Sequence, residues 1–520
     1  MFKSRKEKKI TLLTGLGYGL TDVMGGSSGM LIGAYLMYFY TTFVGLSAME
    51  AAAIFASSKL IDSVVSICMG NITDYFYRTK LGKKFGRRRF FLLFGAPLMF
   101  IYGFLWINGL NYWFYFWTYV IFDILASVVL IPYETLPSEM TSDFNKRTIL
   151  TTGRMLCSGF TSSICTIVGG SLIKIMGENN PNAYFVLGFS FSTLYVICIL
   201  ITYNTTWERE LTAEMIAEQN RNKQSKCISI KEAVKGFIHI VKNYFSTLKV
   251  KAFRQHLIMY LFAVTAQDII VTVFVYFIVF DLGSTASFAS TLLSINLIGV
   301  PLTLVWGMLF VKVGPANLLK FCYITAIVGV LGYYGIYVLH LTNSTLIIAL
   351  IVVSFVFQAG KSCVYFTPWN VFPFIPDVDE IMTGKRREGL FAAVMTFLRK
   401  ATSGIAAIII GAMLESAGLV KDATVQPVVV QHAIALTLLI GGGGLTLISL
   451  LVAFKFKLNT YTHKILINEI QRLKNNGLKR DVDAKTKDVV EHLTGIKYEN
   501  VWPIVANEVD CNSNGENLLI

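Results

Sequence analysis

The sequence predicts an all-α integral membrane protein with twelve transmembrane helices in two six-helix bundles. Of its 520 residues, 54% are hydrophobic and only 15% are charged, which is not the composition of a soluble globule. Apolar stretches of about 20 residues, enough to cross roughly 30 Å of hydrocarbon, recur along the chain. A polar, basic stretch at 205–254 divides them into two blocks of six.

The apolar stretches give the helices in chain order. We expect them at 11–43, 48–76, 89–109, 112–138, 148–175, 182–204, 255–282, 287–312, 317–341, 344–370, 388–416 and 428–455. The first stretch is too long for a cleavable signal peptide and lacks a small-residue cleavage site, so none is expected. The predicted domains are an N-terminal bundle at 1–204, a cytoplasmic basic linker at 205–254, a C-terminal bundle at 255–455 and a cytoplasmic tail at 456–520.

Lysine and arginine are concentrated in alternate connections. They crowd the N-terminus, the connections after the second, fourth, sixth and tenth helices, and the tail, whereas the other loops have almost none. By the positive-inside rule both termini lie in the cytoplasm of a cell-membrane protein, plasma or inner. Anionic lipid then accounts for the net charge of +14, and no nucleic-acid partner is needed.

The tail contains one apolar pattern at helical spacing. Its members, with basic residues between them, are Ile465, Leu466, Ile470 and Leu473. This pattern predicts a short amphipathic helix on the inner membrane surface.

The eight cysteines include no Cys-x-x-Cys pair and have no histidines nearby at metal-ligand spacing. Most of them lie inside apolar runs, namely Cys68, Cys157, Cys165, Cys198, Cys322 and Cys363. We therefore expect reduced core residues and no metal site.

A charged motif follows the second predicted helix. It runs from Gly70 to Arg78, with Asp74 at its centre, and continues into Gly86-Arg87-Arg88-Arg89. A carboxylate facing clustered guanidinium groups can form a latch that holds one conformation. The alternative is a simple stop-transfer cluster. The predicted cytoplasmic gate residues are Asp74, Arg78, Arg87, Arg88 and Arg147.

This motif resembles the G-x-x-x-D-(R/K)…G-R-R signature of the major facilitator superfamily. A weaker match to the same signature, Gly307 to Gly314, lies at the equivalent point of the second half. The stretches Ile131 to Arg147 and Pro376 to Gly389 resemble the glycoside-pentoside-hexuronide:cation symporters, the melibiose permease-like family. The resemblance covers nearly the whole chain. It implies the major facilitator fold and a sugar or glycoside symported with a proton or sodium ion by alternating access.

Ionisable side chains near the bilayer centre are functional candidates by default. Lys59, Asp62 and Ser66 lie on one face of the second helix. The resemblance implies that Asp62 binds the coupling cation, that Ser66 stands at the second carboxylate position, and that Lys400 faces them. Because a carboxylate and a hydroxyl bind a sodium ion less well than two carboxylates do, a proton is favoured as the coupling ion. Alternatively, Asp62 only neutralises Lys59.

The resemblance also implies a sugar site. The residues at the family's substrate-contact positions are Tyr18, Asp22, Arg154 and Trp369. Gly26 and Leu130 stand where melibiose permease uses acidic residues, so galactoside recognition in that form is not expected. Glu134 either replaces one of those acids or belongs to the latch. Asp268 and Lys361 either line the second half of the cavity or pair with one another, and Arg399 is expected to point away from its neighbour Lys400.

No catalytic constellation indicates an enzyme, and no cofactor is expected beyond the coupling ion. Besides a sugar transporter, two alternatives stay open: a transporter of amphiphiles such as lysolipids, and a membrane sensor that does not transport. The expected partners are a sugar or glycoside and membrane lipid, with no nucleic acid, and we expect a monomer.

Overall fold

In the computed structural model, the described residues are 10–141, 143–208, 246–384, 387–421, 423, 425–475 and 477–502. These residues form helices and loops, with no β-strand among them. Within them, nine helices are long and apolar enough to cross a membrane. The protein is therefore an all-α, multi-pass membrane protein, as its composition predicts.

Helices cover all twelve predicted stretches. Those of the N-terminal half are α1 (Leu12–Gly19), α2 (Asp22–Leu31), η1 (Ile32–Leu36), α3 (Met37–Thr42), α4 (Ala48–Tyr75), α6 (Arg89–Leu98), α7 (Ile101–Phe104), α8 (Tyr112–Met140), α9 (Phe144–Met176) and α10 (Pro181–Thr205). The first stretch is divided into four pieces, and α6 ends near Pro97, which lacks the N–H that a continuous helix needs. Twelve membrane crossings thus remain a prediction.

The C-terminal half begins after residue 250. Its elements are α13 (Lys251–Tyr276), η3 (Phe277–Asp281), α14 (Ala286–Ser294), η4 (Ile295–Ile298), α15 (Gly299–Val313), α16 (Pro315–Val338), α17 (Asn343–Val371), α18 (Ile375–Thr383), α19 (Glu388–Ser416), α20 (Val428–Leu436), η6 (Thr437–Gly444) and α21 (Leu445–Lys455). Most of the predicted basic linker, residues 209–245, lies outside the described residues.

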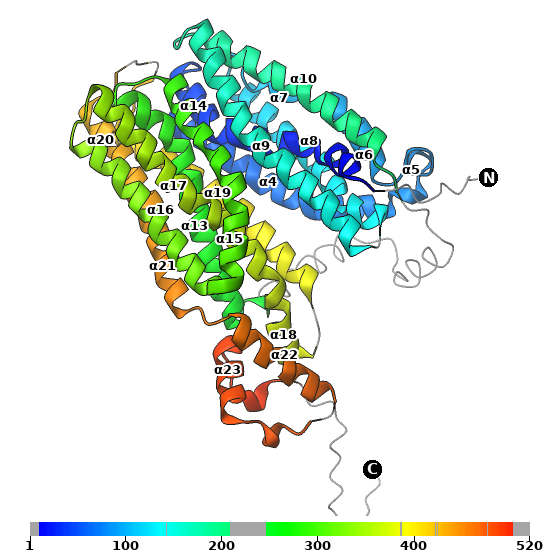
Figure 1. Cartoon of the computed structure of the whole chain (residues 1–520). Helices are drawn as coiled ribbons and strands as arrows, with labels where there is room; N and C mark the ends of the chain where they lie inside the picture. The colour runs from blue at the N-terminus through cyan, green and yellow to red at the C-terminus, as the bar shows by residue number, and fades with distance from the viewer. Residues whose placement is uncertain are drawn as a thin grey trace, which may run out of the picture.

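The two halves meet at one end of the molecule and diverge toward the other (Figure 1). We call the meeting end, with the loops at 43–47, 177–180, 282–285 and 417–427, the short-loop end. We call the opposite end, which carries the arginine-rich loop at 76–88, the basic end. The halves touch where α4 packs on α19, where α9 packs on α14, and where α13 packs on η1 and α3.

Polar and aromatic side chains close the short-loop end. The hydroxyls of Thr41 and Tyr276 lie 2.6 Å apart, and Tyr35 forms a hydrogen bond with Ser290 of α14. The backbone N–H of Ser287 donates to Glu178 across the same junction at 3.2 Å. These side chains are buried or half-buried, so this end is sealed by direct contacts between the halves.

Small residues allow α4 and α19 to pack closely. A Cβ atom added at Gly411 of α19 would lie 2.4 Å from the Cβ of Ala52 and 2.8 Å from the carbonyl oxygen of Ala48. One added at Gly404 would lie 3.3 Å from the Cα of Ala56. Such distances leave no space for larger side chains, so the closed short-loop end depends on these residues.

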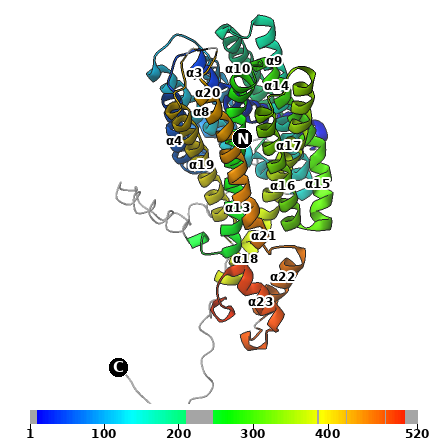
Figure 2. The same cartoon turned by 90° about the vertical axis from the view of Figure 1, so that its left-hand side faces the viewer.

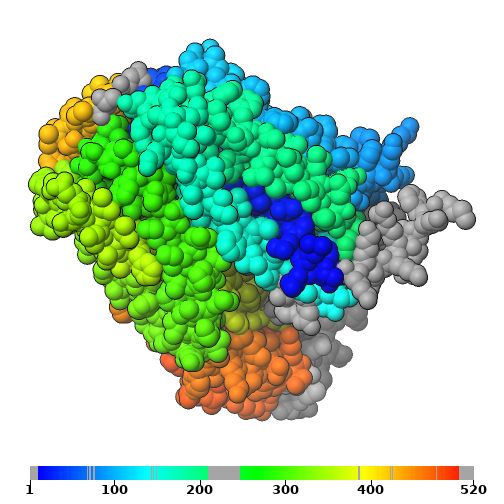
Figure 3. All heavy atoms as spheres, turned by 45° about the horizontal axis from the view of Figure 1, so that its top comes forward, coloured from blue at the N-terminus to red at the C-terminus, as the bar shows by residue number. Residues whose placement is uncertain are grey.

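The predicted tail helix exists as α22 (Thr460–Lys474), and α23 (Ala484–Thr494) follows it. Leu466, Ile470 and Leu473 are buried in a cluster with Val378 of α18, so their apolar face covers protein. The prediction that this helix lies on the membrane surface is therefore wrong. Figures 2 and 3 show the tail, in orange and red, packed against the end of the C-terminal half.

Charged groups fix the tail in this position. His463 Nε2 lies 2.8 Å from Asp377 and Lys474 Nζ lies 2.6 Å from Glu380, and both acids belong to α18. Within the tail, the hydrogen bond with Glu469 raises the pKa of Arg472. The two acidic residues that bind α22 lie 86 and 94 positions earlier in the chain than their partners, so the sequence of the tail alone does not reveal them.

One pair of cysteines departs from the expected reduced state. Cys322 of α16 and Cys363 of α17 form a disulfide, with a Cα–Cα distance of 5.8 Å. The two helices pack closely here, since a Cβ atom added at Gly360 would lie 2.6 Å from the backbone of Ala326. The prediction is wrong for this pair because local sequence does not reveal which helix faces meet. Cys68, Cys157, Cys165 and Cys198 are free.

We expect Gly411→Leu to open the short-loop end, because the new side chain would overlap Ala52 and Ala48 of α4. The test is the reaction of Ser290→Cys, at a buried position, with a membrane-impermeant maleimide in a background that lacks the exposed Cys68. Labelling should become several-fold faster. The control is Gly335→Leu, where the added Cβ meets no atom within 4 Å. Equal labelling of both variants would contradict the packing argument.

Candidate functional site

An ion pair joins the two halves in the middle of the α4–α19 contact. Lys400 Nζ of α19 lies 2.6 Å from Asp62 Oδ2 of α4 and donates to Ser66 Oγ at 2.5 Å. Asp62 Oδ1 accepts from Ser66 at 3.4 Å and from Ser127 of α8. The structure thus brings together three predicted coupling residues, and Ser127 joins them as a ligand that sequence reasoning missed.

Lys59, the fourth predicted coupling residue, has a different partner. Its Nζ lies 3.0 Å from both carboxylate oxygens of Asp123 on α8, and Ser58 donates to the same carboxylate at 2.6 Å. The alternative in which Asp62 neutralises Lys59 is therefore wrong. Asp123 was missed although it is an ionisable residue inside an apolar run, which is the signal that could have found it.

The two α4–α8 pairs have the same construction. Ser58 of α4 binds Asp123 of α8, and Ser127 of α8 binds Asp62 of α4. Each acid lies four residues from the serine on its own helix, so all four side chains face the seam between the helices. Each carboxylate is therefore held by one serine of the opposite helix and one lysine.

The predicted substrate residues of the N-terminal half form one cluster. Arg154 of α9 donates from Nε to Asp22 and from Nη2 to Glu134, both at 2.6 Å. Tyr18 stacks on Tyr133 with ring centroids 4.6 Å apart. Glu134 therefore lies with Arg154 and Asp22, which was one of its two predicted positions, whereas Arg87 and Arg88 bind another acid.

The C-terminal half contributes a second cluster from α13, α17 and α19. Arg399 holds Asp268 through two contacts of 2.7 and 2.8 Å. Trp369 is 46% exposed and meets Tyr260 edge-on at a centroid distance of 6.0 Å. Arg399 thus points away from Lys400, as expected, since Lys400 binds Asp62 of α4. The alternative in which Asp268 pairs with Lys361 is wrong, because Arg399 holds that carboxylate, and the sequence alone does not show which helix faces meet.

The predicted gate residues lie at the basic end. Arg87 Nη2 lies 2.5 Å from Glu139 and Arg88 lies 3.3 Å from the same carboxylate. Arg78 and Arg147 are exposed, and the Nε of Arg147 donates to the carbonyl oxygen of Thr141 at 2.9 Å. The side chain of Asp74 lies outside the described residues.

Two glutamates at the gate were not predicted. Glu139 binds both Arg87 and Arg88, and Glu208 accepts from the backbone N–H groups of residues 87–89 at 2.6 to 2.8 Å. Glu208 therefore caps the first turn of α6, where a negative charge is stabilised.

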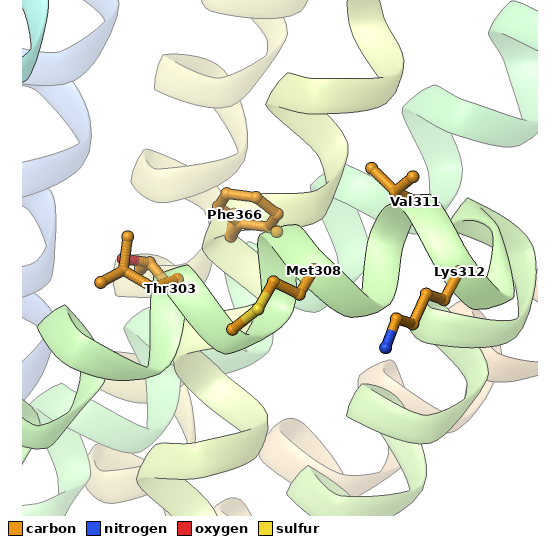
Figure 4. A pocket seen from close by; sticks show the side chains of 7 residues that line it. Thr303, Met308, Val311, Lys312 and Phe366 are labelled. Carbon is orange, nitrogen blue, oxygen red and sulfur yellow. The ribbon is translucent and has the colours of Figure 1, made fainter.

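A groove on the outer face of the C-terminal half has a volume of about 630 Å³ (Figure 4). Its lining is mainly apolar and comes from α15 and α17, with Met308 and Phe366 along it and Lys312 at one end. The weaker match to the motif, at Gly307 to Gly314, thus contributes residues to this groove. In the described part of the chain, no group of three or more His, Cys, Asp and Glu side chains is placed to hold a metal ion.

The family pattern described as "MFS/sugar transport protein" matches residues 17–460 of this chain. The chain is 22% identical to the "Glucuronide carrier protein homolog" of Escherichia coli, over 90% of this chain and 97% of that protein. It is 24% identical to the "Isoprimeverose transporter" of Lactiplantibacillus pentosus, over 78% and 80%. The solved structure of a D-xylose-proton symporter superposes with a TM-score of 0.61 at 15% identity, covering 86% and 98%. That likeness shows the major facilitator fold.

We predict that Lys59 and Asp123 depend on one another for stability. Asp123→Leu leaves a largely buried ammonium without its partner, which should cost about 3 kcal/mol. The variant should therefore show a clearly lower melting temperature in detergent. The double change Lys59→Met with Asp123→Leu removes both charges and should recover most of the loss. Additive losses in the double variant would contradict a direct pairing.

Proposed function

The chain belongs to the MFS/sugar transport protein family, and we propose that it is a secondary active transporter that moves a sugar or glycoside together with a cation. The family and the relatives make it a multi-pass membrane transporter of small molecules. The finer proposal concerns the coupling ion and the substrate. It rests above all on the ion pair between Lys400 and Asp62, which connects the two halves of the molecule.

Lys400 occupies the position that a coupling cation would take. Its ammonium group is shared by Asp62 and Ser66, the oxygens that a proton or sodium ion would need. When the cation binds at Asp62, the attraction that holds Lys400 is lost, and α19 is released from α4. Binding of the cation thus changes the relative stability of the two conformations, which is what coupling requires.

We favour a proton as the coupling ion. Asp62 is the carboxylate of this cluster, and the other ligands, Ser66 and Ser127, are neutral hydroxyls. The nearby carboxylate of Asp123 already accepts from Lys59 and Ser58. A sodium ion binds best to several oxygen ligands that together carry more than one negative charge. A proton needs only one carboxylate oxygen.

Alternating access explains how the halves would act. The sealed short-loop end and the diverging basic end correspond to a state that is open toward the basic end (Figure 1). We propose that the basic end faces the cytoplasm and that the protein lies in the plasma or inner membrane of the cell. When the basic end closes, the arginines of the 76–88 loop would approach the C-terminal half. We propose that their glutamate partners stabilise that loop between states.

The cavity chemistry supports a sugar as the substrate. Asp22, Glu134 and Arg154 supply charged hydrogen-bonding groups on one side. On α17 of the other half, the exposed indole of Trp369 offers a flat apolar surface of the kind on which a sugar ring stacks. Polar hydroxyl edges and an apolar ring face are the two features that such a site would recognise.

An amphiphile is the second candidate substrate. The groove between α15 and α17 is apolar, opens on the outer face and carries a lysine at one end, which suits a lipid chain with an anionic headgroup (Figure 4). Competition by a lysolipid, without competition by any sugar, would favour this alternative. A membrane sensor would show neither uptake nor exchange.

Asp62→Asn should abolish accumulation against a gradient, because the amide retains the shape of the side chain but not the charge that binds the cation. Exchange of substrate across the membrane should survive, since the substrate clusters are separate from Asp62. The measurement is uptake of a labelled sugar by purified protein in vesicles, normalised to inserted protein, because Lys400 loses its partner in this variant. Accumulation equal to that of the wild type would remove Asp62 from the mechanism.

The same vesicles identify the coupling ion. We expect an imposed pH gradient to drive uptake by the wild type more strongly than a sodium gradient. Strict dependence on sodium would refute the preference for protons.

Trp369→Ala should lower substrate affinity roughly fivefold, because the stacking of a ring contributes about 1 kcal/mol. Expression and membrane insertion should be unchanged, since the indole is 46% exposed. Trp117 of α8, which is 55% exposed, offers a control as Trp117→Ala. Unchanged affinity after Trp369→Ala, measured by equilibrium binding, would show that the indole only packs against its neighbours.

A further inference from the structure

Two glutamates at the short-loop end bind the first turns of helices in the opposite half. Glu178, just past the end of α9, accepts from the backbone N–H of Ser287 in α14 at 3.2 Å and also binds the hydroxyl of Ser287. Glu415, near the end of α19, accepts from the backbone N–H of Met49 in α4 at 3.3 Å. Each contact thus joins the end of a helix in one half to the start of a helix in the other.

The two contacts correspond to one another in the two halves. The glutamates follow or end α9 and α19, which contain the fifth predicted stretch of each half, and the donors belong to α4 and α14, which begin the second. In both cases the donor is the second residue of its helix. Such a correspondence is expected where two similar bundles face one another. The same contact is therefore formed twice, in opposite directions.

The two helices that receive the glutamates have caps of their own. Ser47 and Glu50 cap α4 by reciprocal hydrogen bonds. At the start of α14, Thr285 accepts from the backbone N–H of Phe288. These local caps do not use the N–H group of the second residue, and that group is the one that the distant glutamate binds. The two glutamates therefore stabilise the contact between the halves more than the helices themselves.

Glycine allows each pair of helices to approach closely enough for these contacts. A Cβ atom added at Gly170 of α9 would lie 2.4 Å from the Cβ of Ser290 in α14. Gly411 of α19 has the same relation to Ala52 of α4, also at 2.4 Å. Because neither position has space for a larger side chain, each helix end is held where its glutamate reaches the opposite helix.

We propose that Glu178 and Glu415 form a paired latch that holds the short-loop end closed, and that both contacts break each time this end opens. This inference rests on the proposed alternating access and names the residues of the gate opposite the arginine-rich loop. A carboxylate at the start of a helix interacts favourably with the helix dipole and accepts strong hydrogen bonds from the N–H groups there. Both contacts therefore stabilise the sealed state relative to the open one.

The chemistry of the two contacts suits a latch that must break in every cycle. Glu178 is half-buried and Glu415 is exposed, so water can hydrate both carboxylates as soon as the halves separate. The donors are neutral groups, so opening leaves no buried charge without a partner, in contrast to the breaking of an ion pair such as Lys59–Asp123. The latch thus favours the sealed state without trapping it.

The test measures how often the short-loop end is open. Purified full-length protein is spin-labelled at Leu110→Cys and Leu339→Cys, one exposed position in each half at this end. The background lacks the cysteines outside the disulfide between Cys322 and Cys363. Double electron–electron resonance then gives the distances between the two labels and the ratio of open to sealed molecules.

We expect Glu178→Ala to raise this ratio about tenfold, and Glu415→Ala, at the more exposed site, about threefold. Because both contacts oppose the same opening, the two factors should multiply in the double variant. Ser287→Ala, which removes only the hydroxyl that binds Glu178, should raise the ratio by a smaller factor. The control is Asn111→Ala, which should leave the ratio unchanged because Asn111 caps α8 at the same end within its own half.

An unchanged ratio in the double variant would overturn the assignment, and so would an equal increase in Asn111→Ala. Ser287→Ala tests the contact from the opposite helix, so it decides the question even if a glutamate variant fails to fold. Uptake of a labelled sugar by the same proteins separates the latch from the proposed function. Normal uptake with an unchanged ratio would refute the latch alone. Absence of uptake and of open molecules in every protein, the wild type included, would overturn the proposed function and the latch with it.

Discussion

The structure depends on one constraint: a charged side chain inside a bilayer needs a partner. Transfer of a charge into hydrocarbon costs several kcal/mol, so charges are retained there only in pairs or at functional sites. Ion pairs that meet this requirement in the described part of the membrane region include Lys400–Asp62, Lys59–Asp123, Arg154–Asp22 and Arg399–Asp268. The first joins the two halves of the protein, and the other three each lie within one half. In the proposed mechanism, its breakage is the event that frees the halves to move.

The surroundings of this pair are the contacts between α4 and α19 and the contacts of the loop at the basic end. Between the pair and the short-loop end, Gly404 and Gly411 of α19 pack closely against alanines of α4. The backbones of the two helices therefore approach one another closely there. At the basic end, the 76–88 loop is held by glutamates of its own half, so its contacts do not oppose the divergence of the halves. The ion pair is thus a specific polar contact between α4 and α19.

The fold was predictable from the sequence because hydropathy is a local property. The hydrophobicity of each apolar stretch by itself predicts a helix that lies in lipid, and all twelve predicted stretches are helical. The partners of the charges were less predictable, because they depend on how one helix is rotated against another. Thus Lys59 binds Asp123 of α8 instead of Asp62 one turn away, and Arg399 binds Asp268 of α13. The disulfide between Cys322 and Cys363 and the docking of α22 on α18 likewise join positions 41 and 86 residues apart, beyond any local pattern.

The central claim is that Lys400 and the coupling cation compete for the oxygens of Asp62 and Ser66. Its most direct test is the affinity for the coupling cation of purified Lys400→Met, compared with that of the wild type in the same detergent. Methionine has a similar length without the charge, so the competitor is removed while Asp62, Ser66 and Ser127 remain. The account predicts that the variant binds the cation at least tenfold more tightly. Equal or weaker binding by Lys400→Met would contradict it.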